Sequence, residues 1–315
     1  MYQIIDLHQD LMNHMRRPEM YPNGIQTNFE YLERNNIKLL IASVFPVRND
    51  EDYYHVDNLI EIEEDFIRYL DQCCNRPGWL IVRSETDLLR LAEEPNMHGL
   101  ILHLEGLNPI VDNIWPYFER WHGYGWRSVG PVWNLPNALG GGVYDTKKGL
   151  TQFGKEVIEW AQDRNMIIDF AHMNEATFRD ALAVVKGPIL VSHSLAYVVN
   201  STPRNLTDSL LREIAKREGV LGIYLVGDFV KQKNVVEIPD VIDHIDHLVN
   251  VMGIDHIALG TDFGGLAEGF VQGLDSVDGL ALLWDGMEKR GYGITDIRKV
   301  AYDNAWRVLV NILGN

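Results

Sequence analysis

The chain has 315 residues, which is enough to bury the core of a large domain without disulfide or metal staples. Its 28 basic and 45 acidic residues leave a net charge of −17, which argues against nucleic-acid and anionic-membrane ligands because both attract basic surfaces. Its two cysteines, Cys73 and Cys74, are adjacent and therefore indicate neither a disulfide framework nor a cysteine metal site.

Short apolar runs recur along the chain, and a longer amphipathic segment follows most of them. These runs predict strands, because parallel strands that are buried on both faces read as continuous aliphatic stretches. In chain order the predicted strands are residues 3–7, 37–44, 100–105, 127–133, 166–171, 188–193, 219–225 and 256–262, with a short accessory strand at 79–84.

Amphipathic helices are predicted at residues 58–74, 150–165, 205–219 and 296–313, where apolar side chains recur on one face. Thr151 opens the second of these segments and Gly219 is a helix stop for the third. Eight strands that alternate with helices predict an α/β fold, a (β/α)8 TIM barrel in a single domain over residues 1–315. A doubly wound open sheet is the alternative, but no GxGxxG turn follows a first strand.

Two sequence patterns are relevant to the cellular compartment of the protein: a secretory leader and a membrane span. The first residues enter a predicted strand directly, without the charged and apolar regions of a secretory leader. A run of about 18 apolar residues, the mark of a membrane span, is also missing from the sequence. We therefore expect a soluble, cytoplasmic protein.

Side chains that can bind a metal ion stand at the carboxyl ends of several predicted strands, where barrels of this type carry their catalytic groups. His8 and Asp10 lie two residues apart, so an extended strand directs both to the same side. The later strand ends supply Glu105, His172, His193 and Asp262. Imidazoles with carboxylates suit zinc, and a carboxylate can bridge two ions.

These residues stand in motifs that resemble the membrane (renal) dipeptidase family of binuclear zinc peptidases, within the amidohydrolase superfamily. The resemblance covers nearly the whole chain, and its most specific motif is SHSLAYVVNSTPRNLTD, in which an arginine follows a histidine by eleven residues. The other motifs are DLHQDL, HLEGLNPI, GLTQFGKEVIEWAQDRNMIIDFAH, IALGTDFGG and DNAWRVL. The resemblance also makes a homodimer plausible.

The resemblance implies a binuclear metal site. One zinc ion would be held by His8 and Asp10 and the other by His172 and His193, while Glu105 would bridge the two ions and share in catalysis. The implied reaction is the attack of a metal-bridging hydroxide on the amide carbonyl of a dipeptide.

Two further residues complete the implied mechanism. Asp262 would accept a proton from the water and pass it to the leaving amine. Arg204 would bind the terminal carboxylate of the substrate, since a guanidinium fork can bind both carboxylate oxygens at once. The resemblance thus makes this chain a metallodipeptidase whose partner is a small-molecule dipeptide.

One stretch departs from the family pattern. Trp133 stands where the family has a histidine that contacts the substrate carbonyl, whereas Asn134 and Asn137 are retained; Gly264 also replaces a family aspartate. We assign Trp133 and Asn134 to substrate binding. Because of Trp133, an amidohydrolase acting on another amide or ester, such as an N-acyl amino acid or a cyclic amide, is kept as an alternative. A metal-binding protein without turnover is a second alternative.

Three other histidines and one glycine-rich segment are expected to have structural or supporting roles. His103 lies two residues before the bridging carboxylate and is predicted to be a buried supporting histidine. His244 and His247 mimic a helical metal pair, but their segment has the pattern of an amphipathic helix away from the strand ends. The segment 138–145 is predicted to be a substrate loop, because a phosphate cradle would continue with Lys-Ser/Thr.

Overall fold

The computed structural model describes residues 2–45, 58–108 and 113–314. The chain divides into two compact units: unit 1 comprises residues 1–40 and 188–309, and unit 2 comprises residues 41–187 and 310–315. Strand β2 (Ile37–Val44) and helix α13 (Asn304–Leu313) each begin in unit 1 and end in unit 2. The single domain that the sequence predicts stays a prediction.

Unit 1 is built on parallel strands whose order differs from their order in the chain. They are β1 (Ile4–Gln9), β7 (Leu190–Ser194), β8 (Val220–Ile223) and β9 (Ile257–Leu259). β9 pairs with β1 on one side and with β8 on the other, and β8 in turn pairs with β7. The registers place Leu259 beside both Asp6 and Ile223, so residues that follow these strands emerge at one edge of the unit.

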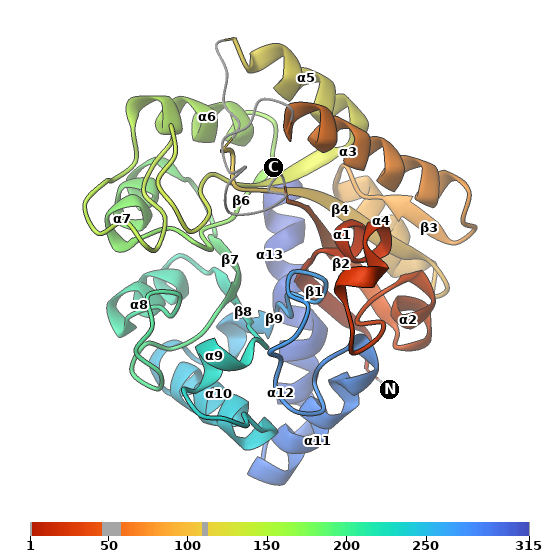
Figure 1. The fold of residues 1–315 in the computed structure, drawn as a ribbon, viewed down its shortest axis with the longest axis vertical. Helices are drawn as coiled ribbons and strands as arrows, with labels where there is room; N and C mark the ends of the chain where they lie inside the picture. The colour runs from red at the N-terminus through yellow and green to blue at the C-terminus, as the bar shows by residue number, and fades with distance from the viewer. Residues whose placement is uncertain (1, 46–57, 109–112, 315) are drawn as a thin grey trace. The chain divides into compact units, whose positions relative to one another are not determined.

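The helices of unit 1 connect and cover these strands. Its helical segments are α1 (Leu11–Arg16), η1 (Pro18–Met20), α2 (Phe29–Arg34), α8 (Asp208–Lys216), α9 (Gly227–Val230), α10 (Ile238–Met252), η2 (Ile254–His256), η3 (Val277–Gly279), α11 (Leu280–Arg290), α12 (Ile294–Arg298) and η4 (Lys299–Asp303). The longest of them, α10, begins at a capping box between Glu237 and Asp240 and buries Val241, Ile245 and Leu248 on one face. It contacts α8 and α11, which flank it in Figure 1.

Unit 2 has its own run of parallel strands, β3 (Trp79–Ile81), β4 (His98–Glu105), β5 (Trp126–Gly130) and β6 (Ile167–Ile168). β4 pairs with β3 and β5, and β5 pairs with β6, with Glu105 in register with Gly130. Its helices are α3 (Asn58–Cys74), α4 (Glu85–Glu93), α5 (Trp115–Tyr124), α6 (Gln152–Gln162) and α7 (Glu175–Val184). Thr151 caps α6 as predicted, because its hydroxyl accepts the backbone N–H of Gly154.

Glycines allow the strands of unit 1 to approach one another closely. A Cβ atom at Gly222 would lie 1.9 Å from the carbonyl oxygen of Ser192, and one at Gly260 would lie 1.8 Å from the same oxygen. Both distances are far inside van der Waals contact, so the two positions exclude any side chain while Ser192 keeps its place. The close packing of these strands therefore requires glycine at positions 222 and 260.

Most predicted elements differ in their bounds from the observed ones. The strand predicted at 166–171 is reduced to Ile167–Ile168, and four residues later His172 has a φ of +64°. The helix predicted at 296–313 is interrupted, because η4 is a π-helical turn between α12 and α13. Helix α8 begins and ends inside its predicted range of 205–219. Among the described residues, none of the helices combines the length and apolar character needed to cross a membrane.

Candidate metal centre

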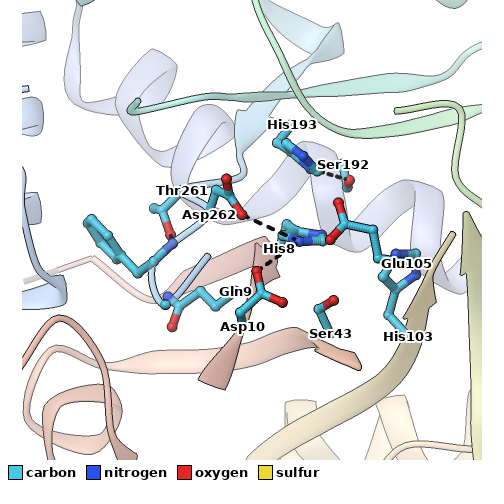
Figure 2. A network of polar contacts seen from close by, with 12 residues as sticks. His8, Gln9, Asp10, Ser43, His103, Glu105, Ser192, His193, Thr261 and Asp262 are labelled. Atoms are coloured by element: carbon cyan, nitrogen blue, oxygen red, sulfur yellow. Dashed lines mark hydrogen bonds and ion pairs between the residues drawn. The ribbon is translucent and has the colours of Figure 1, made fainter. Parts of the chain in front are cut away.

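Unit 1 gathers two imidazoles and two carboxylates around His8, the penultimate residue of β1 (Figure 2). The Nε2 atom of His8 lies 3.6 Å from Oδ2 of Asp10 and 3.6 Å from Oδ1 of Asp262. The ring of His193, which belongs to β7, lies with its centroid 4.2 Å from that of His8. All four side chains are buried, and His8 has no exposed surface.

The spacing of donor atoms in this cluster suits a bound cation. One ligand atom each from His8, His193 and Asp262 lies within 4.8 Å of the others, all three being buried. Zinc takes imidazole nitrogen and carboxylate oxygen at about 2.0–2.2 Å, so ligands around one ion are separated by about 3–4 Å. Buried carboxylates with no cation nearby would cost free energy, which makes the donor set fit a divalent ion.

A buried carboxylate beneath the cluster connects β1 to the residues that follow β9. Asp6 accepts hydrogen bonds from Nε2 of Gln9 at 2.6 Å, from Oγ1 of Thr261 at 2.7 Å and from the backbone N–H of Thr261 at 3.0 Å. Burial raises the pKa of Asp6, and these hydrogen bonds oppose that shift. The network holds the residue before Asp262 against the strand that carries His8.

Asp262 is held in an unusual backbone conformation. Its φ is +65°, a left-handed value that a non-glycine residue adopts at a cost in free energy. The backbone N–H of Asp262 donates to the carbonyl oxygen of His8 at 3.0 Å. The hydroxyl of Tyr224 donates to its Oδ2 at 2.9 Å. The backbone and one carboxylate oxygen are therefore both fixed, and Oδ1 is directed toward His8.

Arg204 is buried beside the same group of residues, with 2% of its surface exposed. Its Nη2 donates to the carbonyl oxygen of His193 at 3.3 Å. Its guanidinium carbon lies 5.2 Å from the ring centroid of Tyr224 and 5.9 Å from that of Phe229. Aromatic faces hold a guanidinium in place by cation–π attraction while its planar donors stay directed at an anion.

Unit 2 contains a second buried pair of predicted ligands. Nε2 of His172 lies 2.9 Å from Oε1 of Glu105, the last residue of β4. Nδ1 of His172 lies 2.8 Å from Oδ1 of Asn134. An amide oxygen can only accept, so Nδ1 carries the proton and Nε2 is the nitrogen left to bind a metal ion. Figure 2 includes Glu105 among the residues that it labels.

Trp133 and Asn134, both assigned to substrate binding, are also in unit 2. The ring of Trp133 lies 4.9 Å from that of Phe45 and 5.9 Å from that of His172. The side-chain oxygen Oδ1 of Asn134 accepts from Nδ1 of His172, a contact that the sequence did not indicate. Asn137, the other retained asparagine, accepts the backbone N–H groups of Leu139 and Gly140 and thereby shapes the start of the 138–145 segment.

The histidines predicted to be structural have structural partners. His103 is fully buried, with Nδ1 at 2.8 Å from Oγ of Ser128 and Nε2 at 3.7 Å from Oδ2 of Asp169. His244 accepts the backbone N–H of Ala196 and donates to a backbone carbonyl, and burial lowers its pKa to about 4. His247 contacts a carboxylate of α8. The prediction that the pair in α10 is not a metal site agrees with these contacts.

Tyr224 is the residue of this neighbourhood that the sequence analysis missed. It directly follows β8 (Val220–Ile223), and its phenol contacts Asp262 across 38 positions of sequence. The rule that barrel enzymes place functional groups at the carboxyl ends of strands pointed to this position. A tyrosine at a strand end has no metal-ligand chemistry that would mark it in the sequence, and its partner Asp262 is far away along the chain.

Comparison with known proteins gives a match along the whole chain. The family model for membrane dipeptidase (peptidase family M19) matches residues 1–313. A Klebsiella pneumoniae protein described as an uncharacterized protein in the pqqA 5′ region is 33% identical over 240 residues, which cover 73% of this chain and 87% of that protein.

Solved structures of similar fold include two metallopeptidases. Dipeptidase AC, a metallopeptidase of family M19, matches 100% of this chain and 99% of its own with a TM-score of 0.89 and 23% identity. A metallopeptidase from Rhodobacter sphaeroides, solved with a phosphinate mimic of the dipeptide L-Ala-D-Ala, matches 99% of both chains with a TM-score of 0.87 and 23% identity. This likeness confirms the predicted fold class, an α/β barrel.

Proposed function

The chain belongs to the membrane dipeptidase family (peptidase family M19) and is a hydrolase of the dipeptidase class, and we propose that it cleaves the amide bond of dipeptides with two divalent metal ions. Zinc is the ion that we assign to the site, because imidazole and carboxylate ligands suit it. The ligand-bound relative from Rhodobacter sphaeroides, whose ligand mimics a dipeptide, supports a substrate of this size.

The proposal assigns five residues to the metal ions, on the strength of the family membership. They are His8, Asp10 and His193 of unit 1 and Glu105 and His172 of unit 2. When bound, ions of this class lower the pKa of water to about 7 and polarise a carbonyl group. Each unit supports its own part of the assignment, since the ligands of unit 1 cluster around His8 and those of unit 2 form a contact of 2.9 Å.

The observation that carries the proposal is the position of Asp262 beside the ligands of unit 1. Its Oδ1 lies 3.6 Å from Nε2 of His8, so the carboxylate borders the place where a water molecule would be activated. Asp262 takes the proton of the attacking water and gives it to the nitrogen of the leaving amine. Arg204 binds the terminal carboxylate of the dipeptide, and its burial beside Tyr224 supports this role.

Trp133 favours a second candidate activity. An indole that packs between Phe45 and His172 fills volume that a histidine would leave open, and it changes the polar group presented to a substrate carbonyl. The second candidate is therefore hydrolysis of another small amide or ester, such as an N-acyl amino acid or a cyclic amide. A panel of dipeptides and N-acyl amino acids at equal concentration separates the two activities, since a dipeptidase prefers the former.

The test of the proposed function combines metal analysis with one substitution. Metal-free protein is loaded with zinc, its metal content is measured, and dipeptide hydrolysis is followed for the wild type and for Asp262→Asn. We expect kcat of Asp262→Asn to fall about 10²- to 10⁴-fold, the usual contribution of general acid–base catalysis, with the metal content retained.

A matched control is Asp278→Asn, which makes the same chemical change in an exposed ion pair with Arg34 and should leave kcat unchanged. Equal activity of wild type and Asp262→Asn would refute the role of Asp262 as the proton carrier. A wild type that holds metal but hydrolyses no member of the panel would instead favour a metal-binding protein without turnover.

A further inference from the structure

Tyr224 lies in unit 1 and contacts both Asp262, the proposed proton carrier, and Arg204, the proposed ligand of the substrate carboxylate. Its side chain is buried, with 3% of its surface exposed. The ring stacks on Phe229 with centroids 5.2 Å apart and planes 14° apart, and its edge meets the ring of His193 at 5.0 Å. These two aromatic contacts restrict the rotation of the ring, so the phenol oxygen has a defined position.

The phenol of Tyr224 restrains the carboxylate of Asp262. A carboxylate that is to take a proton from one molecule and give it to another must keep one oxygen directed at the reacting atoms. Tyr224 donates to Oδ2 at 2.9 Å, and Oδ1 faces His8 at 3.6 Å. Since the terminal torsion of an aspartate is otherwise broad, this hydrogen bond selects which oxygen faces the metal ligands.

The ring of Tyr224 restrains Arg204. The guanidinium carbon lies 5.2 Å from the ring centroid, inside the range of about 6 Å for a cation–π interaction. Phe229 extends the same aromatic surface to 5.9 Å from that carbon. The arginine therefore packs against a stack of two rings that is itself fixed by His193.

We propose that Tyr224 is a positioning residue of the reaction: its hydroxyl orients Asp262 and its ring holds Arg204 at the site for the substrate carboxylate. The inference rests on the proposed function. In the step concerned, a C–O bond forms between water and the carbonyl carbon, the C–N bond breaks, and the proton moves from water to Asp262 and then to the amine nitrogen. The O–H bond of Tyr224 stays intact throughout.

The two tasks can be separated by two substitutions. Tyr224→Phe removes the hydroxyl and keeps the ring, whereas Tyr224→Leu removes both. For Tyr224→Phe we expect kcat for a dipeptide to fall about 10- to 100-fold, as for the loss of a hydrogen bond to a charged group, with KM and zinc content within about threefold of the wild type. For Tyr224→Leu we expect the same loss of kcat and, in addition, weaker binding of the substrate.

Binding measured without turnover tests the part of the proposal that concerns the ring. The probe is a phosphinate mimic of L-Ala-D-Ala, titrated calorimetrically into the zinc-loaded protein. Tyr224→Leu should bind this probe at least about threefold more weakly than Tyr224→Phe does, because only the former loses the aromatic face under Arg204.

A matched control removes a similar hydrogen bond elsewhere in unit 1. The hydroxyl of Tyr292 donates to Oδ1 of Asp246 at 2.7 Å, so Tyr292→Phe deletes a phenol–carboxylate bond away from the site and should leave kcat unchanged.

A kcat of Tyr224→Phe within twofold of the wild type overturns the orienting role, and so does a loss of kcat that parallels a loss of zinc. Equal probe binding by the two Tyr224 variants overturns the role of the ring. If the wild type itself hydrolyses no dipeptide, the proposed function fails and this inference fails with it.

Discussion

The buried imidazole of His244 makes the stability of the protein depend on pH in a way that can be calculated. Its Nδ1 accepts the backbone N–H of Ala196 at 3.2 Å, and its Nε2–H donates to the carbonyl oxygen of Val230 at 2.8 Å. Nδ1 therefore faces a donor and has no acceptor for a second proton. Burial is the main cause that lowers the pKa of His244 to about 4, from a usual value of 6.5.

The size of the effect follows from the two pKa values. Between pH 6.5 and pH 4 the unfolded chain binds a proton at this position and the folded chain does not, so the free energy of unfolding falls as the pH falls. At about 1.4 kcal/mol for each pH unit, the loss from His244 amounts to about 3 kcal/mol over this range and is absent above pH 6.5. His14, whose pKa burial also lowers to about 4, adds a second contribution of the same sign.

The substitution His244→Asn isolates this contribution, because an asparagine oxygen can still accept from Ala196 but does not titrate. Urea unfolding curves, followed by tryptophan fluorescence, are compared for the two proteins from pH 8 to pH 4. We expect the variant to be less stable than the wild type by about 1–3 kcal/mol at pH 8, since the bond to Val230 is lost. Because the wild type alone loses about 3 kcal/mol on acidification, the difference should vanish or change sign by pH 4. Parallel stability profiles for wild type and variant would show that the imidazole is not held neutral by the fold.

Gly222→Ala should lower the free energy of unfolding by about 1–3 kcal/mol or more, as measured by the same denaturation, because the added Cβ would lie 1.9 Å from the carbonyl oxygen of Ser192. Asn134→Ala should weaken zinc binding about 10- to 100-fold in a competition titration, since the variant no longer fixes the tautomer of His172; an unchanged affinity would contradict the positioning role. Asn304→Ala should cost about 1–3 kcal/mol by thermal or urea unfolding, because its amide donates to the carbonyl oxygens of Ile254 in η2 and of Ile257, the first residue of β9.

Much of the fold is encoded by patterns that act over short stretches of sequence. The aliphatic runs predict β2 and the other parallel strands, because a strand that is buried on both faces has apolar side chains at nearly every position. Thr151 marks the start of α6 because a helix N-terminus needs a local acceptor. The alternation of side chains in a strand predicts that His8 and Asp10 point to the same side, and in the structure Nε2 of His8 lies 3.6 Å from Oδ2 of Asp10.

The candidate site was predictable to the extent that its residues lie at strand ends. Asp10 and Asp262 could be selected from their place after a strand and their chemistry, and in the structure both lie 3.6 Å from Nε2 of His8. The two positive φ angles, at His172 and Asp262, were not predictable, because a non-glycine residue adopts this conformation only where surrounding contacts compensate its cost.

By itself, the sequence determined which side chains have the chemistry of metal ligands and which strands carry or precede them, because side-chain chemistry and strand patterns are local properties. Only the tertiary structure decided which residue from a distant part of the sequence contacts and orients each of those side chains. Tyr224 meets Asp262 and Asn134 meets His172 across 38 positions of sequence each, through the parallel packing of separate strands and loops. Pairings of this kind depend on the packing of the whole unit, and no local pattern records them.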